Sequence, residues 1–146
     1  MTAELETTAK SETDSNPRYR WLGEMPRWKT RRLMAKSQAM VLTSLAEGGA
    51  NVVSEALADS IPIISSRIAG SVGILGEGYP GYYEVGDEHD LARVLTQLET
   101  DPLFLKKLKQ WCTELSPMVQ PATEQSLWND LIQEAVQAKS DSLVST

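Results

Sequence analysis

The sequence predicts an α/β fold built on a parallel sheet, and three observations support this prediction. Two short apolar runs, at residues 39–42 and 62–66, have the composition of strands buried on both faces, as parallel strands are. A helical pattern at residues 50–58 lies between them. A third strand pattern, at residues 82–85, precedes further helical patterns. Such alternation is typical of parallel sheets with right-handed crossovers.

The chain divides by composition into three segments. Residues 1–16 are polar and acidic and are expected to be a lead-in, with residues 3–10 as the tail of a preceding helix. Residues 17–138 carry the alternating patterns and form the predicted domain. Residues 139–146 are expected to be a disordered tail.

Three further elements are predicted within the domain: a strand, a helix and a long loop. The strand pattern covers residues 19–22 and ends at Gly23. A helix is expected from Pro26 to about Lys36, because proline suits the first helical turn. Residues 68–81 contain five glycines and are predicted to form a long loop, a feature that is often functional.

Helices are predicted for the rest of the chain. Asp87 is a suitable cap for the first helix, and Asp101 followed by Pro102 is a suitable start for the second. A final helix is expected at about residues 123–138. The first helix has an amphipathic stripe, formed by Leu91, Val94, Leu95 and Leu98.

Charge and composition exclude several classes of function. The 146 residues carry a net charge of −6, so nucleic acid is a poor default partner. No apolar run is long enough for a membrane span, and the polar N-terminus does not resemble a signal peptide. One cysteine allows no internal disulfide, which favours the cytoplasm. One histidine and one cysteine offer no metal-ligand spacing, so no metal and no cofactor are expected.

The charge is distributed unevenly. Residues 17–36 hold seven lysines and arginines but only one acid, Glu24, so this segment is formally +6. A solvated helix face is the simpler interpretation. The alternative is a basic patch that faces a phosphate or a partner domain.

The candidate binding site is the loop and helix start between the two buried strands. Ligands of open α/β sheets bind at the carboxyl ends of strands, and free N–H groups at a helix start can hold a phosphate. A carboxylate on the first turns of the helix can accept hydrogen bonds from ribose hydroxyls. A capped helix with two solvated acids is the alternative interpretation. The residues concerned are Glu47, Gly48, Gly49, Ala50, Asn51 and Glu55.

These residues carry a resemblance to a known family. The spacing E-x7-E, from Glu47 to Glu55, continues into the apolar run at residues 61–66 and then Ala69-Gly70-Ser71. This pattern resembles the donor-binding, C-terminal domain of the group 1 (family 4) glycosyltransferases, which have the GT-B fold. The resemblance covers residues 18–138 and implies a truncated Rossmann-like sheet with extra C-terminal helices.

The resemblance also implies roles for individual residues. It places Glu47 beside the donor sugar as the catalytic candidate and Glu55 on the ribose of the nucleotide. The glycine-rich backbone between them would cradle the diphosphate. The loop that begins with Gly23, Glu24 and Met25 would lie near the nucleobase. Arg67, after the second buried strand, is a candidate cation near the diphosphate, with a solvated loop arginine as the alternative.

Two departures from the family pattern limit what the resemblance implies. Thr43 replaces the proline that usually ends the first buried strand, and the stretch 69–73 lacks the usual glutamate. The family's acceptor domain with its active-site histidine has no counterpart in this sequence, nor do the first two strand–helix units of the donor domain. We therefore expect the chain alone to be inactive, and its exposed sheet edge to favour a homodimer.

A narrower resemblance concerns the substrates. Three stretches together resemble the selenosugar synthases, which join a nucleotide-activated hexosamine to selenophosphate. The stretches are PRYRWLGE, EGGANVVSEA and SSRIAGSVGILGEGYPGYYEVGD. They imply a UDP-linked hexosamine donor. The alternative function is a non-catalytic module that binds a nucleotide or sugar diphosphate, or that docks onto a separate subunit carrying the acceptor site.

Overall fold

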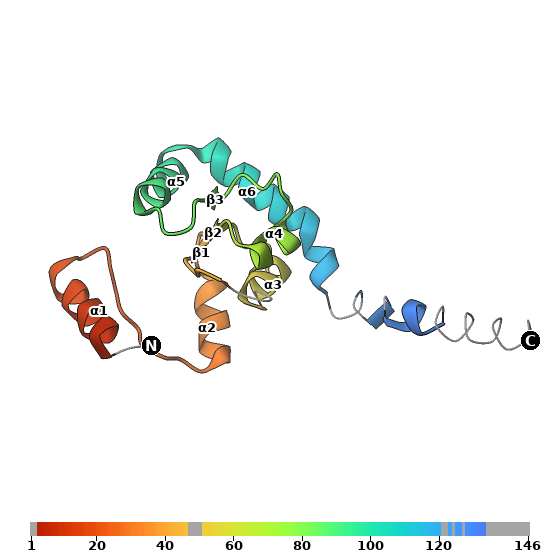
Figure 1. Ribbon diagram of the computed structural model, residues 1–146, viewed down its shortest axis with the longest axis horizontal. Coiled ribbons are helices and arrows are strands. Elements are labelled where there is room, and N and C mark those ends of the chain that lie inside the picture. The colour runs from red at the N-terminus through yellow and green to blue at the C-terminus, as the bar shows by residue number, and fades with distance from the viewer. Residues whose placement is uncertain (1–2, 47–50, 121–122, 124, 127, 134–146) are drawn as a thin grey trace, which may run out of the picture. The chain divides into compact units, whose positions relative to one another are not determined.

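The computed structural model describes residues 3–46, 51–120, 123, 125–126 and 128–133 (Figure 1). Two compact units divide the chain, Met1–Leu33 and Met34–Thr146. The first unit contains α1 (Ala3–Ser15) and most of α2 (Arg27–Met34). The second unit contains the sheet and the remaining helices, and it holds every position at which strands pair.

The first unit is largely exposed, and it differs from the prediction at two points. The helix α1 is longer than the expected 3–10 and ends at Ser15. Residues 19–22 form no strand, so that prediction was wrong. The backbone N–H of Trp21 instead donates to the Thr13 hydroxyl oxygen at 2.8 Å. Residues with strand propensity still need a neighbouring strand to pair with, and no described strand pairs with residues 19–22.

The second unit is built on three parallel strands in the order β1-β2-β3. Strand β1 is Met40–Leu42, β2 is Ile63–Ser66 and β3 is Tyr82–Tyr83. Met40 lies opposite Ile63, and Ser65 lies opposite Tyr82. This parallel sheet with its helices confirms the predicted α/β class and is consistent with a truncated Rossmann-like domain.

Burial differs between the two predicted core strands. All four residues of β2 are buried, as expected. Strand β1 is not buried on both faces, because Val41 is 42% exposed. The prediction failed there because an apolar run cannot by itself reveal whether other elements cover both faces of its strand; β3, which is also at an edge of the sheet, is buried.

A helix, α4 (Ala69–Leu75), occupies much of the segment that was predicted to be a loop. Ile68, Val72 and Leu75 follow a helical spacing, and Ile68 and Leu75 are buried. Gly70 and Gly73 lower the helix propensity of this stretch and conceal the spacing. The loop prediction was therefore wrong for these residues.

The remaining helices pack around the sheet. The helix α3 (Asn51–Ala58) contributes Val53, Ala56 and Leu57 to the core, and α6 (Pro102–Leu115) contributes Phe104, Leu108 and Cys112. The helix α5 (Glu88–Thr100) contributes Val94. A short 3-10 helix, η1 (Ser116–Val119), follows α6.

The two predicted caps are confirmed. The Asp87 carboxylate accepts a hydrogen bond from the backbone N–H of Asp90 at 2.9 Å. Asp101 is both the last cap of α5 and the first cap of α6, where its carboxylate accepts from the N–H groups of Leu103 and Phe104. The described residues of the final predicted helix, up to residue 133, are helical. The predicted tail, 139–146, lies outside the described residues.

Candidate functional site

The candidate site lies at the carboxyl edge of the sheet. Because β1, β2 and β3 are parallel, their last residues meet at one edge. Ligands of open α/β sheets bind at this edge. Helix α3, which begins at Asn51, follows the loop that leaves β1 at this edge.

Only part of the predicted E-x7-E site falls within the described residues. Glu47, Gly48, Gly49 and Ala50 lie outside them, so their roles stay predictions. Asn51 is exposed at the first position of α3, and Glu55 is half-buried on the same helix. Residues four apart lie on one face of a helix, so Glu55 is on the same face of α3 as its first residue.

Two hydrogen bonds fix the end of β1 and the residues just after it. The Ser66 hydroxyl donates to the Ser44 carbonyl oxygen at 2.7 Å, and the Tyr83 hydroxyl donates to the Leu42 carbonyl oxygen at 3.1 Å. Sequence reasoning did not find these contacts. The only signal was a pair of serines at the end of a buried strand, an unusual place for polar side chains.

A third contact ties β2 to the start of α4. The hydroxyl oxygens of Ser65 and Ser71 lie 2.8 Å apart, and the Ser65 hydroxyl is 2.9 Å from the Ser66 carbonyl oxygen. All three serines are buried, and each has a hydrogen-bond partner. The carboxyl edge is thus a hydrogen-bonded frame whose geometry is set before any ligand binds.

Arg67 follows β2 at this edge, and other side chains of the protein contact its guanidinium group. That group pairs with the Glu77 carboxylate at 2.5 Å and lies 5.2 Å from the centre of the Tyr82 ring. Burial raises the pKa of Tyr82 to about 12, and the charge of Arg67 partly opposes this rise. A phosphate could reach Arg67 only in competition with Glu77.

The predicted nucleobase loop lies in the first unit. Gly23 has a φ of 65°, a left-handed conformation that glycine adopts easily. Glu24 is exposed and Met25 is half-buried. Each unit is described by itself, so the placement of this loop near a nucleobase stays a prediction.

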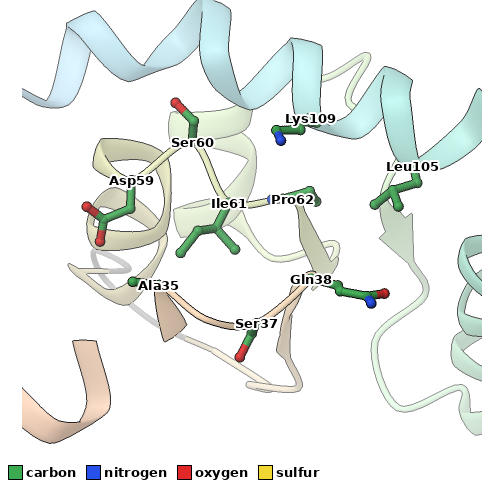
Figure 2. Close-up of a pocket in the computed structure, with 9 residues that line it drawn as sticks. All are labelled: Ala35, Ser37, Gln38, Asp59, Ser60, Ile61, Pro62, Leu105 and Lys109. Atoms are coloured by element: carbon green, nitrogen blue, oxygen red, sulfur yellow. The ribbon is translucent and has the colours of Figure 1, made fainter. Parts of the chain in front are cut away.

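Two pockets lie at opposite edges of the sheet. One of about 160 Å³ is at the carboxyl edge and is lined by Thr43, Leu45, Tyr83, Gly86, Asp87, Glu88 and Leu91. The other, of about 300 Å³, lies where β1 and β2 begin. In Figure 2, the lining residues Ile61 and Pro62 lie between the side chains of residues 35–38 and Leu105 and Lys109, which come from α6. None of the predicted site residues lines it.

The sequence does not favour His89 or Cys112 as a catalytic residue, and the structure places the first at the surface and the second in the core. His89 is exposed on the first turn of α5, and Cys112 is fully buried beside Tyr79. Burial raises the pKa of the Cys112 thiol, which disfavours the thiolate form that reacts.

Within the described ranges, no group of three or more metal-binding side chains occurs. The part of the chain that the structure describes also has no helix long and apolar enough to cross a membrane.

The sequence profile of the family described as Glycosyl transferases group 1 matches residues 4–114. This range includes all three strands and α2 to α5, together with nearly all of α1 and α6. No curated protein matches the chain.

Proposed function

The chain belongs to the group 1 glycosyltransferases, and we propose that it binds a nucleotide-sugar donor at the carboxyl edge of its sheet. The observation that supports this most is the extent of the family match, which covers the strands that form this edge. The family implies a nucleotide-sugar donor. The hydrogen-bonded ends of β1 and β2 offer a rigid support for the loop in which the diphosphate would bind.

Within this proposal, helix α3 supplies two interactions. N–H groups at its start hold the diphosphate, where the positive end of the helix dipole favours anions. Glu55 lies on the same face and accepts hydrogen bonds from the ribose hydroxyls. Glu47 orients the sugar from the preceding loop. The protein thus stabilises negative charge on the leaving diphosphate by electrostatics.

The acceptor side of the reaction is a further proposal. The single histidine, His89, is exposed on α5 and belongs to a helix start. The family resemblance implies that a histidine of an acceptor-binding part, on another domain or subunit, would complete the site. We expect the chain alone to bind the donor without transferring the sugar. Binding with no turnover, even when an acceptor-binding part is supplied, would favour the alternative of a non-catalytic binding module.

The test is a titration of the purified chain with UDP and UDP-N-acetylglucosamine, followed by NMR chemical shifts. Glu55→Gln should weaken binding about tenfold or more, because a hydrogen bond to a charged group contributes about 1.5–3 kcal/mol. Glu114→Gln removes an exposed carboxylate from α6 and serves as the matched control. Equal affinity of the Glu55 variant and the wild-type chain would contradict the proposed role of Glu55. No binding by a folded chain would contradict the donor site itself.

The finer substrate proposal is a UDP-hexosamine donor and a selenophosphate acceptor. Its support is the resemblance of the three sequence stretches described above. Titration with UDP-N-acetylglucosamine, UDP-glucose and GDP-mannose separates the donors. A preference of less than about threefold among them would remove the support for the hexosamine.

A further inference from the structure

The segment around α2 carries a strongly basic surface to which the proposed donor site assigns no role beyond the loop at Gly23, Glu24 and Met25. Residues 17–36 are formally +6, while the whole chain is −6, so the other residues sum to −12. The cations lie on α2 and on the segments that flank it. A charge separation of this size orients a protein in front of any extended anionic surface.

Large apolar side chains lie exposed among these cations. Trp28 on α2 is 62% exposed, and Leu22 and Leu33 are 43% and 45% exposed. The Lys29 ammonium lies 5.5 Å from the centre of the Trp28 ring, so cation and indole share one patch of surface. We call Trp28, Lys29, Arg32 and Leu33 of α2 the basic-apolar patch; Leu22 is exposed on the segment before this helix.

The spacing on α2 concentrates charge around the indole. Trp28, Arg31 and Arg32 are at positions i, i+3 and i+4, so they lie on one face of the helix. Tryptophan prefers the boundary between water and hydrocarbon, because its ring is apolar and its N–H is polar. Arginines and lysines beside it suit the phosphate groups of lipids.

From these observations we propose that the basic-apolar patch binds the surface of an anionic lipid bilayer. Helices that lie on membranes combine a strongly basic face with tryptophan and leucine, and clusters of four to eight Lys/Arg on such helices favour anionic lipids. A nucleic acid would attract the same charges, but it would leave Leu22 and Leu33 without an apolar environment.

The test is flotation of the full chain with vesicles of phosphatidylcholine alone and of phosphatidylcholine with one-third phosphatidylglycerol. The chain should float only with the anionic vesicles, and 0.5 M salt should release it. The double variant Lys29→Gln/Arg32→Gln should partition about 30-fold less, since each lysine or arginine near an anionic surface contributes about 1 kcal/mol. Trp28→Ser should also weaken binding while leaving the charge unchanged.

A matched control has the same charge change at another place. Lys106→Gln/Lys107→Gln alters two exposed lysines of α6 and should bind vesicles within about threefold of the wild-type chain. Circular dichroism checks that every variant is folded. Equal loss in both double variants would overturn the proposal, and so would no flotation of the wild-type chain. Retention of a 20-nucleotide RNA in a gel shift, with no vesicle binding, would assign the patch to nucleic acid instead.

Discussion

The Tyr79 hydroxyl pairs with both backbone groups of Ile63. It donates to the Ile63 carbonyl oxygen and accepts from the Ile63 N–H at 3.1 Å. Its oxygen also lies 3.7 Å from the Cys112 sulfur, and its ring packs edge-on against Trp111. The Tyr79 side chain, from the segment before β3, therefore forms hydrogen bonds with the backbone N–H and carbonyl of Ile63, the first residue of β2. It also joins this strand to α6 through Trp111 and Cys112.

Tyr79→Phe should lower the free energy of unfolding by about 1–3 kcal/mol. Phenylalanine keeps the ring contacts but leaves the buried groups of Ile63 without the hydroxyl. Urea denaturation followed by circular dichroism measures the change. Tyr83→Phe is the comparison, since it removes one hydrogen bond to Leu42 and should cost only about 0.5–1.5 kcal/mol. A larger loss for Tyr83→Phe than for Tyr79→Phe would contradict this account.

Stability should fall at alkaline pH because of the buried tyrosines. Burial raises the pKa of Tyr82 to about 12, whereas an unfolded tyrosine ionises at about 10. Below pH 10, Tyr82 is protonated in both the folded and the unfolded chain, so its burial causes no loss of stability. Between pH 10 and 12 the unfolded chain loses the proton first, so the free energy of unfolding declines.

Denaturation midpoints at pH 8, 9.5 and 11 measure this decline. Tyr82→Phe should make the decline shallower, even though the variant also loses hydrogen bonds to Ser71 and Gly76. The comparison therefore uses the slope against pH and not the absolute stability. An equal slope in the variant and the wild-type chain would assign the alkaline effect to other groups, Tyr79 among them.

Two glycine-to-alanine variants should change stability in opposite directions. At Gly81, an added Cβ would lie 2.5 Å from the Ile63 carbonyl oxygen and 2.7 Å from the Tyr79 ring. Gly81→Ala should therefore destabilise the fold by about 1–3 kcal/mol. At Gly73 on α4 a Cβ meets nothing within 4 Å, so Gly73→Ala should stabilise by about 0.5–1 kcal/mol. Thermal unfolding of both variants gives the test, and the same sign of change for both would refute it.

Arg67 and Glu77 should affect diphosphate binding in opposite directions. If Arg67 contacts the donor phosphates, Arg67→Gln should weaken UDP binding several-fold. Glu77→Gln should strengthen it by about twofold to fivefold, since an exposed ion pair that competes with the phosphate contributes about 0.2–1 kcal/mol. Calorimetric titration at low salt measures both. Unchanged affinity in the two variants would show that Arg67 acts only within the protein, against Glu77 and Tyr82.

Local signals predicted the parts of the fold that depend on near neighbours. The caps at Asp87 and Asp101 are correct because a carboxylate bonds N–H groups two or three residues away. The buried strand β2 is correct because its apolar run is central in the sheet. Helix α4 was missed because its glycines conceal a helical spacing that tertiary packing stabilises.

The parts that could not be predicted depend on distant residues. Val41 is exposed although it lies in an apolar run, because burial depends on which distant elements cover the strand, and its own sequence does not indicate them. The contact between Tyr83 and Leu42 joins residues 41 positions apart, so no local pattern shows it. At the candidate site, the sequence predicted where Asn51, Glu55 and Arg67 lie in the order of elements. It did not predict that Glu77 already pairs with Arg67.

Asp101 ends α5 and begins α6, so no spacer separates the two helices. One residue inserted after it would turn α6 by about 100°, since a helix has about 3.6 residues per turn. Phe104, Leu108 and Cys112 would then leave the core positions that they fill. Evolution can lengthen or shorten a solvent-exposed loop at little cost, but this corner tolerates substitutions and not changes in length. Among descendants of this sequence, insertions and deletions should be absent from the α5–α6 corner.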